Sequence, residues 1–487
     1  MAMPLDNPLE IPEITGIVAS YLAPKDLASC LRVSKEWLAL FLPHRWKSIN
    51  VGFKPSKKSD GSISMRSFSR FGPHAADIYR HRHLIHNLKI SGDLDGLDKY
   101  IYPNLRKLVV DYYHGAKEPD RMIFLELVEM FPLVESLDLD YVKIEAATWL
   151  TLSTHSHITT LSLEGIVITS SAVSGFWRTW TKLECLVLRG VTIEGGAIPD
   201  DVMFLRLTSL SLCHMDLYGA QQLRLIFQCP ALRSFEWRDS EWDDGDTYTV
   251  TKDLIPNEGW PHLKVLEIEG RDDTEVASIL EGIGNQHEGL DRLHLYDCAF
   301  LDQSSRALEL HFSTLVDLTL PTLSVPSAVI PDILCSCPRL QSLFVGCVLV
   351  RDIVNGGDWA CRQLKTLRIC FRLEEGEQDL QHDLFTRLSS LVRLECLSMG
   401  YHEPEGTHRH STVEFRLENG LGQLASLKQL KILKFHGCCP QLSMDEIAWM
   451  KVHWKNLTIT GGPLHKEHEE DENLKAAMKI LGIPFSK

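Results

Sequence analysis

Leu183-Glu184-Cys185-Leu186-Val187-Leu188 is one copy of a six-residue pattern, Leu-x-x-Leu-x-Leu, that recurs along most of this chain. Leu207-Thr208-Ser209-Leu210-Ser211-Leu212 is a second full copy. In the other copies the three leucine positions hold apolar residues of several kinds. These apolar triples are Ile85/Leu88/Ile90, Leu105/Leu108/Val110, Val134/Leu137/Leu139, Ile158/Leu161/Leu163, Leu232/Phe235/Trp237, Leu263/Leu266/Ile268, Leu290/Leu293/Leu295, Leu315/Leu318/Leu320, Leu340/Leu343/Val345, Leu364/Leu367/Ile369, Leu394/Leu397/Met399, Leu430/Leu433/Phe435 and Trp454/Leu457/Ile459. Each copy predicts a short strand whose apolar side is buried.

The copies are spaced almost evenly. Most steps are about 24 or 25 residues, as from Leu183 to Leu207, and a leucine-rich repeat takes roughly 20–29 residues. A few longer steps, such as Leu394 to Leu430, mark loop insertions. Because each unit repeats a strand and then a helical segment in one sense, the strands are expected to lie side by side and parallel. The sequence therefore predicts an α/β leucine-rich-repeat solenoid, a right-handed horseshoe with parallel strands inside and helices outside.

The chain divides into four predicted parts. The repeats take residues 85–461, and their clearest helical segments are 120–131, 221–229, 274–284 and 380–391. Residues 51–84 are predicted to be a polar linker followed by a capping helix over 68–84, because the open ends of a solenoid need covering. Residues 462–487 hold an acidic stretch, 467–472, and a second cap helix over 474–481. Residues 1–50 form the remaining part.

Composition excludes several classes of protein. A net charge of -15 and a pI near 5.8 argue against general nucleic-acid binding. We find neither a secretory start nor an apolar stretch of about 18 residues that could cross a membrane. The 13 cysteines are scattered singly, which favours a reduced intracellular protein. No nucleophile, phosphate-loop or zinc motif stands out. His81, His83 and His86 have a spacing that allows a metal ion, but a solvated helix end is the simpler interpretation.

The first 50 residues have the periodicity of short helices. Ile11, Ile14, Val18 and Tyr21 recur at steps of three and four, which places them on one face of a first helix. The helix boundaries are marked by Pro24 at the start of a second helix, Ser34 as the N-cap of a third, and Pro43 as its end. Because three short helices bury little surface, we expect leftover apolar surface that suits a docking partner.

These residues resemble an F-box. The resemblance is carried by Pro8-Leu9-Glu10-Ile11 with Ile14, Ala19-Ser20-Tyr21-Leu22, Asp26-Leu27, Cys30, Val33-Ser34 and Trp37, although the opening departs from the usual Leu-Pro-x-Glu-Ile. It implies binding to the Skp1 adaptor of SCF ubiquitin ligases, and through it to a cullin. The matching contact positions are Pro8, Leu9, Ile11, Ile14, Leu22, Leu27, Val33 and Trp37. For each of them the alternative is a place in the core of the helical unit.

The repeats resemble those of F-box proteins with leucine-rich repeats, as at Cys229-Pro230-Ala231-Leu232 and Cys337-Pro338-Arg339-Leu340. Residues that alternate with the apolar triples should face solvent on the concave side of the sheet. Many of them are acidic or aromatic, which favours a basic protein segment as the partner. The predicted contact residues are Asp111, Tyr112, Asp138, Asp140, Tyr141, Glu164, Trp237, Glu267, Glu269 and Tyr296. The alternative is an acidic sheet that simply faces water.

By this resemblance the chain is expected to be a substrate-recognition subunit of an SCF-type E3 ubiquitin ligase. It would be a non-catalytic adaptor in the cytoplasm, the nucleus or both. The expected partners are a Skp1-like adaptor with its cullin and an unknown target protein, with no nucleic acid, membrane, metal or cofactor. The alternative is a leucine-rich-repeat scaffold that is not linked to ubiquitination.

Overall fold

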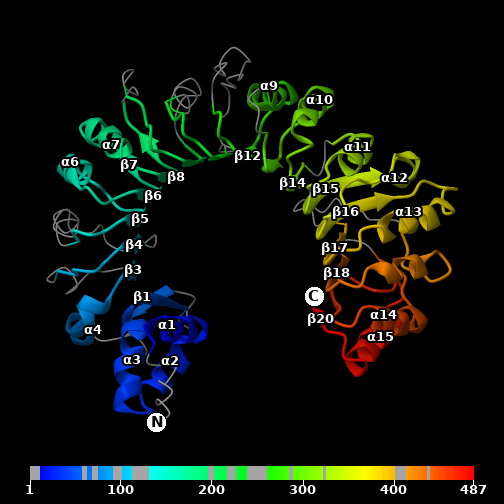
Figure 1. Cartoon of the computed structure of the whole chain (residues 1–487), viewed down its shortest axis with the longest axis horizontal. Coiled ribbons are helices and arrows are strands. Elements are labelled where there is room, and N and C mark those ends of the chain that lie inside the picture. The colour runs from blue at the N-terminus through cyan, green and yellow to red at the C-terminus, as the bar shows by residue number, and fades with distance from the viewer. Residues whose placement is uncertain are drawn as a thin grey trace, which may run out of the picture. The chain divides into compact units, whose positions relative to one another are not determined.

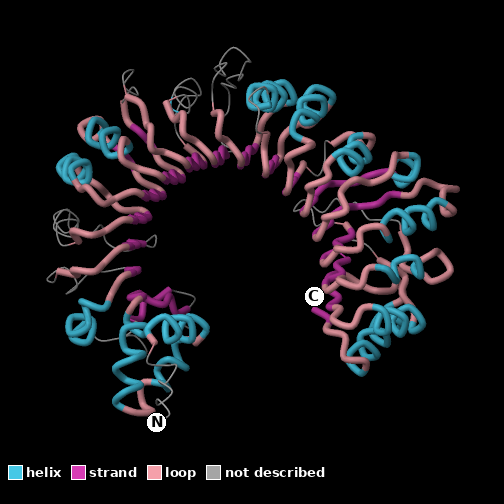
Figure 2. The backbone as a smooth tube through the Cα atoms, viewed as in Figure 1, coloured by secondary structure: helices cyan, strands magenta, loops and turns pink. Residues whose placement is uncertain are grey.

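The computed structural model describes residues 11–57, 63–67, 75–91, 101–111, 131–195, 202–215, 225, 228–238, 260–284, 289–321, 325–400, 413–435 and 439–486. The chain folds into two compact units, Met1–Cys229 and Pro230–Lys487. In each unit, parallel strands lie along one side and helices along the other (Figures 1 and 2). Among the described residues, no helix is both long enough and apolar enough to span a lipid bilayer.

The first unit begins with the three helices that the sequence predicts: α1 (Pro12–Tyr21), α2 (Pro24–Cys30) and α3 (Lys35–Trp46). Pro24 opens α2, and the Ser34 side chain accepts a hydrogen bond from the Trp37 backbone N–H at 3.2 Å, so both predicted boundaries are confirmed. Pro43 does not end α3, because it lies in the last turns, where one missing N–H donor interrupts little of the helix.

The sheet of the first unit starts earlier than predicted. Its parallel strands are β1 (Ser48–Lys57), β3 (Asn87–Ser91), β4 (Lys107–Asp111), β5 (Ser136–Asp140), β6 (Thr160–Glu164), β8 (Cys185–Arg189) and β10 (Ser209–Cys213). β2 (Ile63–Ser67) is antiparallel to β1. The prediction of a linker over 51–57 is therefore wrong. Trp46-x-x-Ile49-x-Val51 has the spacing of the apolar triples, and Ile49 pairs with Leu88.

Helices cover the apolar side of this sheet. They are α4 (Ala75–His81) with the 3-10 turn Arg82–Leu84, α6 (Ala146–Thr154) and α7 (Val173–Trp180), and a small ladder joins β7 (Val167–Ile168) to β9 (Thr192–Ile193). Of the predicted helix over 68–84, residues 75–84 are described and helical. Most of the predicted helices 120–131 and 221–229 lies outside the described residues.

The second unit continues the same alternation. Its parallel strands are β11 (Ser234–Arg238), β12 (Val265–Glu269), β13 (Arg292–Tyr296), β14 (Asp317–Thr319), β15 (Ser342–Leu349), β16 (Thr366–Arg372), β17 (Cys396–Met399), β18 (Ile432–Phe435), β19 (Thr458–Gly461) and β20 (Phe485–Ser486). Its helices are α9 (Asp273–Gly284), α10 (Asp302–Leu308), α11 (Val329–Ser336), α12 (Val350–Asn355), α13 (Leu380–Ser389), α14 (Met444–His453) and α15 (His468–Ile480), with 3-10 turns at Glu309–His311 and Leu421–Ser426. The predicted helices 274–284 and 380–391 correspond to α9 and α13.

The apolar triples form the core of both units. Every residue of the predicted triples is at most 3% exposed. Within each unit the second member of one triple pairs with the second member of the next, as Leu186 does with Leu210 and Leu343 with Leu367. The structure therefore confirms an α/β fold of parallel strands alternating with helices, consistent with a leucine-rich-repeat solenoid.

The end of the array differs from the prediction in two ways. Ile459, predicted as the third member of the last triple, pairs with Leu433 and so takes the second position, with Gly461 opposite Phe435. The predicted acidic stretch 467–472 mostly belongs to helix α15, which begins at His468. Carboxylates in the first turn of a helix are stabilised by the amide dipoles there, so this charge run favours a helix start over a loop.

Candidate binding surfaces

The N-terminal helices leave an apolar face open. Their core is small and consists of Ala19, Leu27 and Phe41, with five partly buried hydrophobic residues packed around it. On α1, Ile14, Ile17, Val18 and Tyr21 follow helical spacing and are 36%, 60%, 36% and 85% exposed. Ile11, Val33 and Leu38 are also exposed. A helical face this apolar and this open is typical of a protein-docking surface.

The predicted adaptor contacts divide between this surface and the core. Ile11, Ile14 and Val33 are exposed, whereas Leu27 is 8% exposed and belongs to the core. Leu22 and Trp37 are partly buried and pack against that core. Pro8 and Leu9 lie outside the described residues. The prediction of Leu27 as a contact residue is therefore wrong, because its side chain packs inward between helices. Ile17 was not among the predicted contacts, although the three-and-four spacing of Ile14 and Val18 could have indicated it.

The solvent side of the first unit's sheet carries a row of carboxylates. Asp111 pairs with Asp140, and Asp140 pairs with Glu164, so three acidic side chains follow one another across β4, β5 and β6. Asp138 lies on the same face of β5, two residues from Asp140. Lys89 Nζ lies 3.5 Å from Asp111 Oδ2. Burial, together with the charges of Asp138, Glu164 and Asp111, raises the pKa of Asp140 to about 6. These predicted residues do lie together, as an acidic patch.

Replacing Asp140 with Asn is expected to stabilise the protein above about pH 6. An acid whose pKa rises from 3.8 to about 6 on folding is destabilising once it is ionised, and the penalty disappears below the unfolded pKa. Because the side chain is only half-buried, solvent screening reduces the expected gain to about 1 kcal/mol. Urea unfolding of both proteins near pH 8 and near pH 4 measures it, and equal stability near pH 8 would contradict the prediction.

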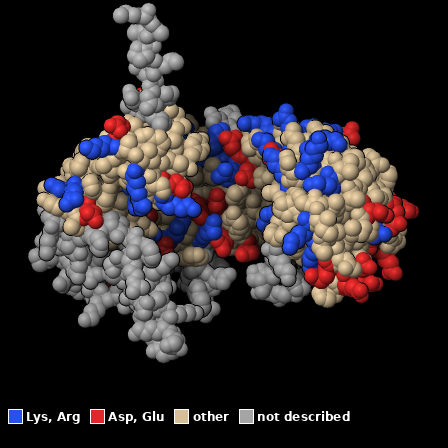
Figure 3. All heavy atoms as spheres, turned by 90° about the horizontal axis from the view of Figure 1, so that it is seen from below, with Lys and Arg blue, Asp and Glu red and all other residues tan. Residues whose placement is uncertain are grey.

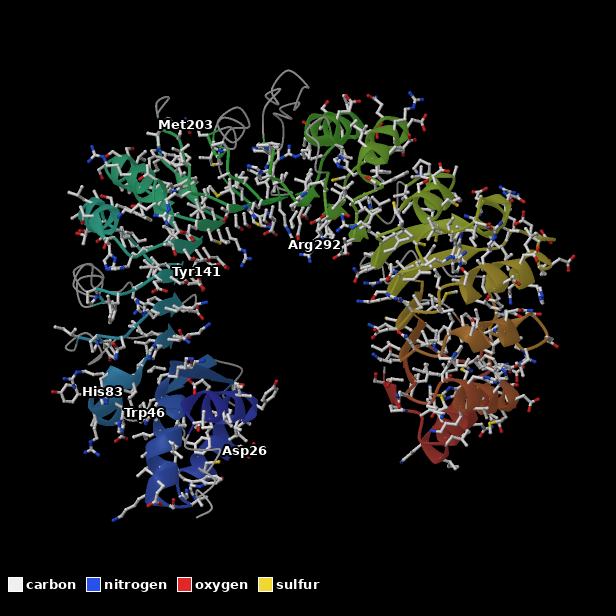
Figure 4. All side chains as sticks on the ribbon, viewed as in Figure 1. Asp26, Trp46, His83, Tyr141, Met203 and Arg292 are labelled. Carbon is white, nitrogen blue, oxygen red and sulfur yellow. The ribbon has the colours of Figure 1, made fainter. Side chains whose placement is uncertain are left out.

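Tyr141 lies at the end of this patch. It is 40% exposed and has a backbone φ of 57°, and its amide donates a hydrogen bond to the Glu164 carbonyl. Figure 4 shows Tyr141 on the strand side of its unit, away from the helices. Tyr112, the neighbouring aromatic residue of the prediction, lies outside the described residues.

The solvent side of the second unit carries one continuous row of side chains. Strand pairing places them in register in the order Glu236, Glu267, His294, Thr319, Phe344, Arg368, Ser398, Lys434 and Thr460. The row is acidic over β11 and β12 and basic over β16 and β18. Figure 3 shows both acidic and basic side chains on the surface of the second unit, in the right-hand part of the picture. We call this set the register row.

The acidic half of the register row is a network of ion pairs. His294 lies between Glu267 and Asp317, with its two ring nitrogens 3.5 Å and 3.4 Å from their carboxylates. Burial alone would lower the pKa of His294, but the two carboxylates raise it to about 9. Arg238 Nε lies 2.8 Å from Glu236, and Arg238 Nη2 lies 3.5 Å from Glu267. The imidazolium therefore cross-links three adjacent strands electrostatically.

Of the contact residues predicted in the second unit, three lie on the solvent side of the sheet and one lies in the core. Glu267, Glu269 and Tyr296 are half-buried on the solvent side, and Tyr296 Oη lies 3.3 Å from His294 Nδ1. Trp237 is 3% exposed, so its prediction as a surface anchor is wrong. Its position is the third of an apolar triple, which faces the core, and the Arg271 guanidinium stacks 3.8 Å from its ring.

Several residues of this surface were not predicted from the sequence. His294 occupies the same alternating position as Glu267, so the repeat pattern places it on the solvent side, but histidine does not fit the acidic character by which the contact residues were predicted. Asp317 and Arg292 lie two residues before Thr319 and His294 in their strands, on the same face, and they pair with each other at 3.3 Å. Figure 4 shows Arg292 on the strand side of its unit. The pattern of apolar residues does not predict that Asp317 and Arg292 form an ion pair.

Metal-type ligands gather elsewhere, on α15. Within the described part of the chain, His468, Asp471 and Glu472 are the group whose ligand atoms lie within 4.8 Å of one another. The Lys475 ammonium lies 2.5 Å from Asp471 and 3.0 Å from Glu472. A lysine so placed already neutralises the carboxylates and would repel a cation.

Comparison with known proteins leaves the family open. The chain matches no model of a known protein family, and no curated protein matches it.

Proposed function

We propose that this chain is the substrate-recognition subunit of an SCF-type ubiquitin ligase. The N-terminal helices would bind a Skp1-like adaptor, and the strand side of the repeats would hold the target protein. The observation that carries the proposal is the open apolar face of α1, where Ile17 and Tyr21 are 60% and 85% exposed on a unit with a very small core. Exposed apolar surface of this kind is costly in water unless a partner covers it.

The mechanism would be positional. A chain that holds the adaptor at one end and a target on its repeats raises the effective concentration of the target near the ubiquitin-charged enzyme. Such a role requires no catalytic group in this chain. A parallel sheet with a long row of solvent-facing side chains suits it, because many strands contribute to one continuous contact surface.

Co-purification with Skp1 tests the proposal. The double variant Ile17→Asp/Val33→Asp is expected to lose binding by at least about tenfold, since each change puts a charge into an apolar contact. Both residues are exposed, so the helices should still fold. Leu27→Asp would not be informative, because Leu27 belongs to the core.

Val452→Asp is the matched control. Val452 is 71% exposed on α14 in the second unit, so the same substitution there changes surface charge without touching the N-terminal helices. Skp1 should bind this variant as it binds the unmodified protein. If the unmodified protein does not retain Skp1, or if the Ile17/Val33 variant retains it equally well, the chain is a repeat scaffold outside ubiquitination.

A further inference from the structure

The basic half of the register row has polar groups with no partner. Arg368, Ser398, Lys434 and Thr460 lie side by side on β16, β17, β18 and β19. Ser398 is 2% exposed, yet its hydroxyl makes no hydrogen bond. The Thr460 hydroxyl and Arg368 Nε are buried and equally without a hydrogen-bond partner. A buried polar atom without a partner costs free energy, so several together in one row indicate a missing ligand.

The two cations in this half also lack counter-ions. Among the described residues, neither Arg368 nor Lys434 has a carboxylate within ion-pair distance. Burial lowers the pKa of Arg368 below its usual range, but arginine stays charged at neutral pH. Its guanidinium stacks 4.3 Å from the Phe344 ring, which holds it on the sheet. In the acidic half, by contrast, Arg238 and His294 are both paired with glutamates.

The basic half of the register row therefore brings hydrogen-bond donors and positive charge together on the solvent side of β16 to β19. Neighbouring strands lie about 4.8 Å apart, so Arg368 and Lys434 flank Ser398 at roughly one strand spacing on either side. A tetrahedral oxyanion above Ser398 would reach the guanidinium from one side and the ammonium from the other. Guanidinium, ammonium and hydroxyl donors in such an arrangement are those that proteins use to bind phosphate.

We propose that Arg368, Ser398, Lys434 and Thr460 form a binding site for a phosphate monoester. The dianion would neutralise both cations and accept hydrogen bonds from Arg368 Nε and the Ser398 hydroxyl. The two positive charges match a phosphate dianion better than the single negative charge of a carboxylate, which favours the tetrahedral anion. The phosphate is carried either by a small molecule or by a phosphorylated side chain of a protein. The site does not depend on the proposed link to ubiquitination.

Titration of the full-length protein with three probes tests the site. The ionic strength is kept constant, because contacts between charges weaken as salt is added. The probes are inorganic phosphate, a short phosphoserine peptide and its unphosphorylated counterpart, with heat release on binding as the measurement. We expect phosphate or the phosphopeptide to bind and the unphosphorylated peptide not to bind. Binding of the phosphopeptide at least about tenfold tighter than phosphate would identify a protein-borne group, and similar affinities a small molecule.

Three variants separate this site from general charge attraction. Arg368→Gln and Lys434→Gln should each weaken binding about tenfold or more, as expected for a lost charge-assisted hydrogen bond. Ser398→Ala should also weaken binding, yet fold at least as well as the unmodified protein, because it removes a hydroxyl without a partner. Arg292→Gln is the matched control, since Arg292 lies on the same face but is paired with Asp317. Absence of binding by both phosphate probes, or equal binding by the Arg368 and Arg292 variants, would overturn the proposal.

Discussion

Replacing His294 with glutamine is expected to lower the free energy of unfolding by about 3 kcal/mol near pH 6. His294 is charged and lies between Glu267 and Asp317, at 3.5 Å and 3.4 Å. Glutamine keeps much of the side-chain volume but removes the positive charge, so the two carboxylates lose the group between them. Since the His294 side chain is only 16% exposed, water screens the loss weakly.

The effect should depend on pH in a defined direction. The pKa of His294 is about 9 in the folded protein and near 6.5 when unfolded. A basic group whose pKa rises on folding contributes its full stabilisation below the unfolded pKa and loses it as pH rises through the folded pKa. The difference between the two proteins should therefore be largest below about pH 6.5 and shrink toward about pH 9.

Urea unfolding at several pH values measures this difference. Tyr296→Phe is a suitable control, because it removes only the hydroxyl that lies 3.3 Å from His294 and leaves the imidazolium between its carboxylates. That variant should keep the pH dependence of the unmodified protein. A His294→Gln curve parallel to that of the unmodified protein from pH 6 to pH 9 would show that the histidine charge does not stabilise the sheet.

Gly461→Ala is the second change with a large expected effect. Gly461 ends β19 with a φ of +115°, a conformation that residues with a side chain rarely adopt. A Cβ added there would lie 2.4 Å from the Phe435 carbonyl oxygen and 2.8 Å from its carbon. Both contacts are to backbone, so β18 and β19 would have to move apart. We expect a loss of roughly 3 kcal/mol or more in unfolding free energy.

Gly270→Ala separates the two causes of this loss, which are backbone strain and steric overlap with the neighbouring strand. Gly270 also has a positive φ, +71°, but a Cβ there would meet no atom within 4 Å. That variant should therefore cost only the backbone strain, about 1 kcal/mol. Chemical denaturation of both variants measures the difference. If they lose the same stability, the close approach of Phe435 to Gly461 does not limit packing of the last strands.

The first strand of the sheet, β1, was only partly predictable from the repeat pattern. Ile49 and Val51 extend the apolar columns of Leu88 and Ile90, with which they pair. Residues 51–57 were nevertheless predicted as a linker, because the segment that follows is rich in lysine, serine and glycine. Residues 53–57 pair with β2 in an antiparallel ladder, which the repeat pattern does not mark, so their local composition can be that of a loop.

The sequence by itself determined the repeat architecture, because an apolar triple at a constant spacing has one arrangement that buries every copy. It also determined the Ser34 cap, which depends only on neighbouring residues. The tertiary structure alone decided which apolar side chains of the N-terminal helices point outward, since Leu27 and Ile17 are equally apolar in sequence. It also decided which charges have partners: Arg238 lies beside Glu236 of its own strand and Glu267 of the next, whereas Arg368 lies beside a serine whose hydroxyl has no partner. Packing between helices decides the first outcome, and pairing between strands about 30 residues apart contributes to the second, so neither can be read from a local pattern alone.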